Sequence, residues 1–245
     1  MKCIILAAGY ATRLYPLTEN FPKPLLKVGE KTILDWLIDD IDSSKEIDEY
    51  IVISNHKFYE HFKKWSDEHR LNITVVDDGT TSNEDRLGAV RDIEFAIRKH
   101  NINDDCMVIA GDNVLDFSLA KFIEYFKEKN SSVVMCYFEG DTKRLQKSGV
   151  LTLIEDGRIV KMEEKPEKPE SNWCCPPFYI YKKEDMARIS EALDNGCNVD
   201  APGSLVSWLC TRTEMYAFEM PGKRFDIGNL ESYENVKRTY RGIIK

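Results

Sequence analysis

Residues 3–26 read CIILAAGYATRLYPLTENFPKPLL, an apolar run followed by a loop of small residues, prolines and the two cations Arg13 and Lys23. A connection between a strand and the following helix normally needs two to six residues. Here more than twenty residues separate the apolar run from the helical pattern that begins near Thr32. Loops of this length in compact domains are usually functional or disordered, and this composition is not typical of disorder. We therefore interpret the loop as a candidate site.

The first half of the chain alternates short apolar runs with amphipathic helical patterns. The runs have the length and continuous apolarity of buried strands, and they occupy residues 3–8, 50–54, 73–76 and 106–110. Between them, apolar residues recur at the spacing of one helix face, as in residues 34–41. This alternation predicts βαβ units and a largely parallel sheet that helices cover on both faces.

The second half predicts more strands. Residues 131–140 would continue the sheet, and residues 149–166 contain two alternating strands around Asp156-Gly157, a dipeptide that favours a hairpin with a type I′ turn. Further elements are expected as helices near 184–195 and 204–212, a strand near 214–220 and a last helix over about 230–243. The predicted fold class is α/β: a Rossmann-like three-layer sandwich with a mostly parallel mixed central sheet and an added β-hairpin.

Composition excludes several classes of function. The formal net charge is −8, whereas a general nucleic-acid binder would carry a basic face. No apolar run is long enough to span a membrane, and no secretory signal precedes the first strand, so we expect a cytoplasmic protein without nucleic-acid or membrane partners. The seven cysteines lack metal-site spacing and are expected to be thiols of the core in a reducing compartment.

Small residues and carboxylates gather where the predicted strands end. These ends read AAG (7–9), NH (55–56), DDG (77–79) and AGDN (110–113). In an open α/β sheet, ligands bind beyond the carboxyl ends of the strands. Small residues let the backbone approach a ligand, and the Arg13 guanidinium and Lys23 ammonium suit phosphate oxygens. The loop lacks both G-x-G-x-x-G and the P-loop pattern, which argues against a standard dinucleotide or P-loop site.

The order of five segments resembles the sugar-phosphate nucleotidylyltransferases, also called nucleotide-sugar pyrophosphorylases, including those that act on glucose 1-phosphate with thymidine triphosphate. The segments are LAAGYATRLYPLTENFPKPLL (6–26), LGAVRDIEFAI (87–97), VIAGDNVL (108–115), SGVLTL with KMEEKP (148–153 and 161–166), and RFDIGNLESYENV (224–236). The resemblance covers nearly the whole chain. Two departures are Ala11, where the family usually has glycine, and SNWCCPPFYIY (171–181) beside the sugar site.

The resemblance implies an enzyme of nucleotide-sugar biosynthesis that joins a nucleoside triphosphate to a sugar 1-phosphate and releases pyrophosphate. It implies a single domain over 1–245, with a nucleotide-binding half (1–130) and a half for the acceptor phosphate and second metal ligand (131–245). The implied roles, by residue, are nucleotide binding by Leu6, Ala7, Ala8, Gly9, Gly88 and Asp112; catalysis by Arg13, Lys23 and Lys165; acceptor binding by Gly149, Glu164 and Lys165; and Mg²⁺ binding by Asp112 and Asp226. An oligomer is possible.

Two alternatives stay open. The same chemistry on a phosphorylated alcohol such as phosphocholine would make the protein a cytidylyltransferase, and Trp173, Phe178 and Tyr179 could supply part of an aromatic cage for the cation. The second alternative is a non-catalytic nucleotide sensor. A sensor has no need for both metal carboxylates, so Asp112 and Asp226 argue against it.

Overall fold

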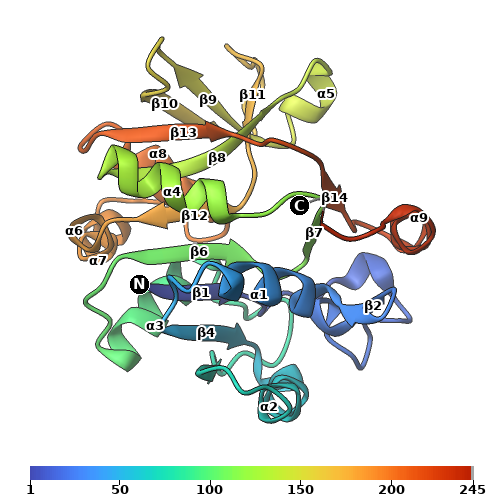
Figure 1. Ribbon diagram of the computed structural model, residues 1–245. Coiled ribbons are helices and arrows are strands. Elements are labelled where there is room, and N and C mark those ends of the chain that lie inside the picture. The colour runs from blue at the N-terminus through green and yellow to red at the C-terminus, as the bar shows by residue number, and fades with distance from the viewer. Residues whose placement is uncertain (244–245) are drawn as a thin grey trace. The chain divides into compact units, whose positions relative to one another are not determined.

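The computed structural model describes residues 1–243, which form two compact units (Figure 1). The first unit consists of Met1–Arg86, Ala110–Ala120 and the chain from Pro221 onward. The second consists of Leu87–Ile109 and Lys121–Met220. Each unit therefore draws its elements from distant parts of the sequence. The expected single domain with halves 1–130 and 131–245 stays a prediction.

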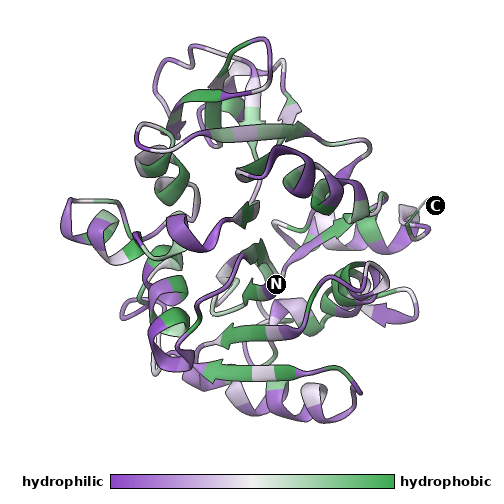
Figure 2. Cartoon of the chain, turned by 60° about the vertical axis from the view of Figure 1, so that its left-hand side comes forward, coloured by the Kyte–Doolittle hydropathy of each residue, from purple (hydrophilic) through white to green (hydrophobic). Residues whose placement is uncertain are grey.

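A parallel sheet of three strands forms the centre of the first unit. The strands are β1 (Lys2–Leu6), β4 (Glu49–Ser54) and β5 (Ile73–Asp77), and β4 lies between the other two. Ile4, Ile5, Ile51 and Val52 are completely buried, which is the pattern of a parallel sheet covered on both faces. Figure 2 shows strands mainly in the hydrophobic colour and loops mainly in the hydrophilic colour. The strands predicted at 3–8, 50–54 and 73–76 are confirmed.

Helices α1 (Ile33–Ser43) and α2 (Tyr59–Asp67) belong to the same unit. The side chain of Thr32 accepts a hydrogen bond from the Asp35 N–H, and the Asp35 carboxylate accepts one from the Thr32 N–H. This capping box fixes the start of α1 directly after the long loop. Short 3₁₀ turns at Thr12–Leu14, Lys23–Leu25 and His56–Phe58 complete the chain between these elements.

Two small antiparallel pairs and helix α9 (Leu230–Thr239) hold the loop in place. The pairs are β2 (Lys27–Val28) with β3 (Lys31–Thr32), and β7 (Asn113–Leu115) with β14 (Arg224–Asp226). The Tyr233 hydroxyl donates to the Lys27 carbonyl at 2.8 Å, and the Tyr240 hydroxyl donates to the Leu115 carbonyl at 2.8 Å. Helix α9 thus bonds to β2, and Tyr240, the residue directly after the helix, bonds to β7. Helix α9 ends at Thr239, so the helix expected to reach 243 is shorter than predicted.

The second unit contains a mixed sheet in the order β10-β9-β11-β8-β12-β6, with β13 parallel to β8. The strands are β6 (Cys106–Ala110), β8 (Ser132–Phe138), β9 (Gly149–Leu153), β10 (Ile159–Glu164), β11 (Trp173–Cys175), β12 (Phe178–Tyr181) and β13 (Met215–Glu219). Strand β12 pairs antiparallel with both β6 and β8. The strands predicted at 106–110, 131–140 and 214–220 are confirmed, whereas β11 and β12 were not predicted.

Strands β9 and β10 form the predicted hairpin, with Gly149 opposite Glu164. The predicted type I′ turn is wrong. That turn needs positive φ at both central residues, and of the dipeptide only Gly157 has it, at 81°. The Gly157 N–H instead donates to the Ile154 carbonyl, and the Ile154 N–H donates to the Arg158 carbonyl, so the loop consists of the three residues 155–157 rather than the two central residues of a type I′ turn.

The helices of the second unit are α3 (Ala89–His100), α4 (Ala120–Lys129), α5 (Thr142–Leu145), α6 (Lys183–Met186), α7 (Ile189–Asp194) and α8 (Gly203–Leu209). The predicted helix at 184–195 is thus two short helices. Six of the seven cysteines are buried, as expected for thiols of the core. Within residues 1–243, no helix is long and apolar enough to cross a membrane. The predicted Rossmann-like α/β class with a mixed sheet and an added hairpin is confirmed.

Candidate active site

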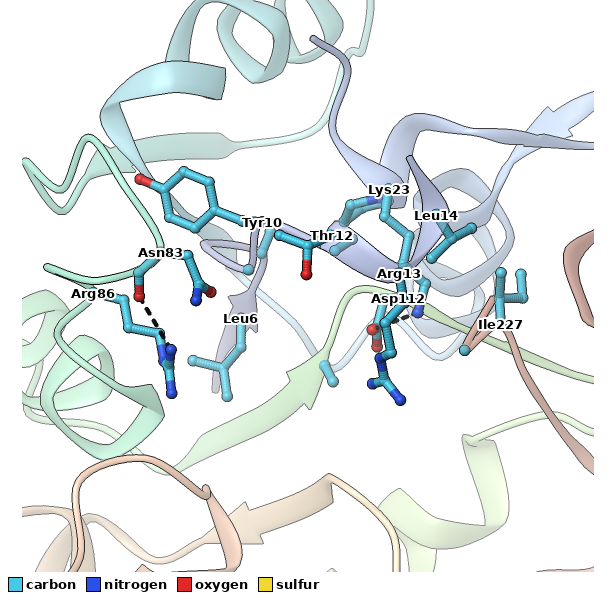
Figure 3. Close-up of a pocket in the computed structure, with 16 residues that line it drawn as sticks. Leu6, Tyr10, Thr12, Arg13, Leu14, Lys23, Asn83, Arg86, Asp112 and Ile227 are labelled. Carbon is cyan, nitrogen blue, oxygen red and sulfur yellow. Dashed lines mark hydrogen bonds and ion pairs between the residues drawn. The ribbon is translucent and has the colours of Figure 1, made fainter. Parts of the chain in front are cut away.

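A cavity of about 360 Å³ opens in the first unit where β1 ends (Figure 3). The residues that line it include six of the predicted site residues, namely Leu6, Ala7, Gly9, Arg13, Lys23 and Asp112. Ala8 does not line it, and the Ala8 carbonyl accepts a hydrogen bond from Asn55 Nδ2 at 2.9 Å. The long loop and the end of a later strand thus contribute to one cavity.

The loop contains an alanine in a conformation that is unusual for this residue type. Ala11 has φ 48° and ψ 42°, the left-handed region that favours glycine. Its carbonyl accepts bonds from the Leu14 N–H at 2.9 Å and from Thr18 Oγ1 at 2.8 Å, and these bonds hold that conformation. Ala11 therefore adopts a left-handed backbone conformation without being a glycine. The exposed side chain of Arg13 follows at the cavity wall.

Lys23 and Asp112 form an ion pair inside this cavity. The ammonium nitrogen Nζ of Lys23 lies 2.7 Å from Asp112 Oδ2, and Figure 3 shows the two side chains pointing toward each other. The Lys23 side chain is only 8% exposed, whereas that of Asp112 is 42% exposed. Pro22 precedes the 3₁₀ turn that carries Lys23, and Pro24 follows Lys23 within it, so the backbone has little freedom. The lysine is held at the carboxylate.

The second predicted metal ligand, Asp226, comes from the far end of the sequence. In the pair of β7 and β14, Asp226 lies opposite Asn113, the residue that follows Asp112. Asn113 Nδ2 donates to Asp112 Oδ1 at 2.8 Å, and Arg224 Nη1 donates to Asn113 Oδ1 at 2.7 Å. Arg224 Nη1 also lies 3.4 Å from Asp226 Oδ1. A continuous polar network therefore connects the two aspartates.

Sequence reasoning missed Asn113 and Arg224, which form this network, and Asn83 and Arg86, which line the same cavity. Figure 3 shows Asn83 and Arg86 at the end of the cavity opposite Arg13 and Asp112. The only available signal for Asn113 was its place next to Asp112 in the strand end AGDN. Arg224 carried none, because its partner is more than a hundred residues away in the sequence.

The acceptor residues predicted from the resemblance belong to the second unit. Gly149 and Glu164 lie opposite each other in the hairpin. A Cβ atom on Gly149 would lie 3.2 Å from Glu164 Oε1, and one on Gly203 would lie 2.1 Å from the same oxygen. The carboxylate thus occupies space that only glycine leaves open. Burial raises the pKa of Glu164, and the charge of Lys165 opposes that shift.

Glu164 also lines a second cavity, of about 350 Å³, with Asn195, Asn198, Trp208 and Arg212. Lys165 is exposed and has φ 49°, with its N–H bonded to the Ser148 carbonyl at 2.9 Å.

Gly88, predicted to bind the nucleotide, has a packing role. A Cβ there would lie 2.5 Å from the Val199 carbonyl oxygen, and its φ of 92° favours glycine.

The aromatic residues considered as a cage for a cation do not form one. Phe178 is completely buried and Tyr179 is 2% exposed. Tyr179 stacks on Tyr181 with ring centroids 5.7 Å apart, and Trp173 meets Phe138 edge to face at 5.8 Å. The faces of Phe178 and Tyr179 are therefore used in packing.

The two aspartates suit a hard divalent cation. Both side chains are partly exposed, at 42% for Asp112 and 66% for Asp226, and they offer carboxylate oxygens, the ligands that Mg²⁺ prefers. Within residues 1–243, no group of three or more His, Cys, Asp or Glu side chains could hold a metal ion. Magnesium usually takes one or two carboxylates and fills its remaining positions with phosphate oxygens and water. The donor set fits magnesium that arrives with a phosphorylated ligand.

Comparison with known proteins gives consistent matches. The family model described as nucleotidyl transferase matches residues 2–242. A glucose-1-phosphate adenylyltransferase from Clostridium novyi is 27% identical over 95% of this chain and 64% of its own length. A UTP–glucose-1-phosphate uridylyltransferase from Haloferax volcanii is 26% identical over 97% of this chain and 96% of its own length. The chain therefore spans less than two thirds of the length of the adenylyltransferase from Clostridium novyi.

Solved structures agree on the fold. A UDP-glucose pyrophosphorylase complexed with UDP-glucose superposes with a TM-score of 0.81, at 20% identity, over 98% of this chain and 97% of that one. A UDP-glucose pyrophosphorylase from Acinetobacter baumanii superposes with a TM-score of 0.76, at 16% identity, over 98% and 92%. At these identities the likeness concerns the fold alone.

Proposed function

Because the chain belongs to the nucleotidyl transferase family, we propose that it transfers a nucleotidyl group from a nucleoside triphosphate to a sugar 1-phosphate and releases pyrophosphate. The observation that carries this proposal is the placement of Arg13, Lys23 and Asp112 in one cavity at the end of β1. The names of the relatives, which act on sugar 1-phosphates, support the choice of acceptor.

The proposed reaction is an in-line displacement. An oxygen of the acceptor phosphate attacks the α-phosphorus of the triphosphate, a new P–O bond forms, and the bond to pyrophosphate breaks. The attacking phosphate is already ionised, so no general base is required. Phosphoryl transfer of this kind depends on positioning and on neutralisation of charge. Arg13 and Lys23 would hold the triphosphate, and Lys165 would hold the acceptor phosphate.

Magnesium is part of this proposal. Asp112 and Asp226 would hold the ion, which when bound neutralises phosphate charge and orients the reacting groups. Asn113 and Arg224 would keep the two carboxylates in position through the bonds described above. The nucleobase would lie toward Asn83 and Arg86, because these side chains line the end of the cavity away from Arg13 and Lys23, which would hold the phosphates (Figure 3).

A phosphocholine acceptor is not favoured. A choline group needs open aromatic faces, and Phe178 and Tyr179 are buried in packing contacts. In the second cavity, the ring of Trp208 is already covered by the guanidinium of Arg212 at 4.0 Å. A sensor is not favoured either, since it would not need both carboxylates and the network that joins them.

A screen for pyrophosphate release tests the proposal. Each of the common nucleoside triphosphates is incubated with Mg²⁺ and a panel of phosphorylated acceptors that includes hexose 1-phosphates and phosphocholine. We expect turnover with at least one sugar 1-phosphate. Turnover with phosphocholine alone would favour the cytidylyltransferase, and binding of a triphosphate without turnover for any pair would favour the sensor.

A further inference from the structure

Both carboxylate oxygens of Asp112 are occupied by donors in the protein alone. Oδ2 accepts from Lys23 Nζ at 2.7 Å, and Oδ1 accepts from Asn113 Nδ2 at 2.8 Å. Asn113 is 2% exposed and is held in turn by Arg224, so the donor on Oδ1 is fixed. A cation that approaches Asp112 must therefore compete with Lys23 for Oδ2.

Lys23 cannot leave this oxygen at low cost unless another anion replaces it. Its side chain is 8% exposed, and a buried ammonium group without a partner is strongly unfavourable. Pro22 and Pro24 on either side limit any backbone movement that would carry the side chain to solvent. A divalent cation on Asp112 would also place two positive charges close to the ammonium of Lys23, which lies 2.7 Å from Asp112 Oδ2.

We propose that Lys23 excludes divalent cations from Asp112 until a triphosphate is bound. The phosphate oxygens then accept the ammonium of Lys23, and the released Oδ2 becomes a metal ligand. The inference rests on the proposed function, because it needs a triphosphate in this cavity. Its consequence is a coupling of binding: triphosphate and metal each strengthen the binding of the other, and Lys23 increases that coupling.

The exchange makes an unusual prediction about a lysine proposed to act in catalysis. Removing its charge should strengthen metal binding in the absence of nucleotide, while it weakens turnover. A hydrogen bond between charged groups contributes enough that its removal is expected to change the dissociation constant by about 10- to 100-fold. A lysine that only bound phosphate would leave metal binding to the nucleotide-free protein unchanged.

Mn²⁺ titration followed by electron paramagnetic resonance tests the proposal without any turnover. The proteins are the unaltered chain, Lys23→Met and Lys23→Gln, whose replacement side chains are uncharged and one atom shorter than lysine. We expect Mn²⁺ without nucleotide to bind both variants at least about tenfold more tightly than the unaltered chain. Adding Asp112→Asn to Lys23→Met should abolish the gain.

Lys31→Met is the matched control, because Lys31 Nζ pairs with Asp39 at 2.6 Å on the exposed surface of the same unit. This control should bind Mn²⁺ like the unaltered chain. Equal Mn²⁺ affinities for the unaltered chain and both Lys23 variants would overturn the inference. The proposed function would survive that result if pyrophosphate release were observed. A nucleotide that binds without turnover would refute the proposed function but not the exchange.

Discussion

Asp226 on β14 lies opposite Asn113 on β7. Because Asn113 directly follows Asp112, the fold places Asp226 beside the neighbour of the other aspartate. The Asn113 side chain also links Asp112 to Arg224, because it donates a hydrogen bond to Asp112 and accepts one from Arg224. If the two carboxylates hold one Mg²⁺, Asp112→Asn and Asp226→Asn should each abolish turnover. The double variant should be little worse than either single one, because both act through the same ion.

The readouts are initial rates of pyrophosphate release and thermal unfolding. Asp226→Asn should leave the melting temperature nearly unchanged, because the exposed pair with Arg224 contributes little to stability. Asp39→Asn, which removes an exposed carboxylate elsewhere in the same unit, is the control for loss of negative charge. Additive losses in the double variant would indicate that the two aspartates act separately.

Arg13 offers the clearest test of the loop. Its exposed side chain lines the cavity beside the 3₁₀ turn Thr12–Leu14. Removal of one preorganised charge from a transition state typically costs about 10²–10³ in kcat, and we expect a loss of this size for Arg13→Ala. Arg70→Ala, at an exposed arginine outside the cavity, should have no effect. A loss below about tenfold for Arg13→Ala would assign the loop a structural role instead.

Substitution of Lys165 distinguishes binding of the acceptor from binding of the triphosphate. If it holds the acceptor phosphate, Lys165→Ala should raise the KM for the acceptor about tenfold or more, the effect of losing one hydrogen bond between charged groups. The KM for the triphosphate should change little. Lys168→Ala, three residues further along the same exposed segment, is the control. Steady-state kinetics with each substrate varied in turn would measure this, and equal weakening for both substrates would contradict the assigned role.

The sequence predicts the strands and helices whose signal is local. Strand β4 is a continuous apolar run, and α1 has both a capping box and an apolar face, so each is recognisable on its own. Strands β11 and β12 were missed because Pro176 and Pro177 separate two short segments rich in cysteine and aromatic residues. Their strand character depends on pairing with β8, β9 and β6, which is not visible locally.

The same limit applies to the candidate site. Residues within one segment, such as Gly9 and Arg13, are recognised by their composition and order. The contact of Lys23 with Asp112 and the pairing of Asp226 with Asn113 arise only when distant segments meet in the fold. A resemblance can suggest that such residues share a site. It does not indicate that Arg224 supports them, because that contact depends on this chain's own side chains.

A substitution at Gly203 tests whether Glu164 needs the space that this glycine leaves open. A Cβ at Gly203 would lie 2.1 Å from Glu164 Oε1 and 2.5 Å from the Met162 methyl group, so Gly203→Ala must displace the carboxylate. We expect the KM for the acceptor to rise about tenfold or more, as for loss of one such bond, with triphosphate binding unchanged. Gly140→Ala is a matched control, because a Cβ there meets nothing within 4 Å. Unchanged kinetics for Gly203→Ala would show that the acceptor does not contact Glu164.

Glu164 should also affect stability in a way that depends on pH. Burial raises the pKa of its carboxyl above the ordinary value of 4.5, so ionisation of this group lowers the stability of the folded protein. The stability associated with the protonated form is fully present below pH 4.5 and is lost as the pH rises through the raised pKa of the folded state.

Glu164→Gln keeps the shape of the side chain but cannot ionise. It should therefore raise the melting temperature at pH 7–8, because it removes the cost of ionising a buried carboxyl. The difference from the unaltered protein should shrink as the pH falls and vanish near pH 4, where Glu164 is protonated in both states. Thermal unfolding at several pH values measures this.

Glu163→Gln is the control, since Glu163 is the neighbouring carboxylate on β10 and pairs with Lys161 at 3.0 Å near the surface. It should lower the melting temperature slightly or leave it unchanged, because it loses an ion pair and relieves no burial. A melting temperature for Glu164→Gln that is lower than that of the unaltered protein at pH 7–8 would mean that the ionised carboxylate is satisfied in the folded state. In that case Glu164 would hold the hairpin to α8, and its proposed role toward the acceptor would lose its physical basis.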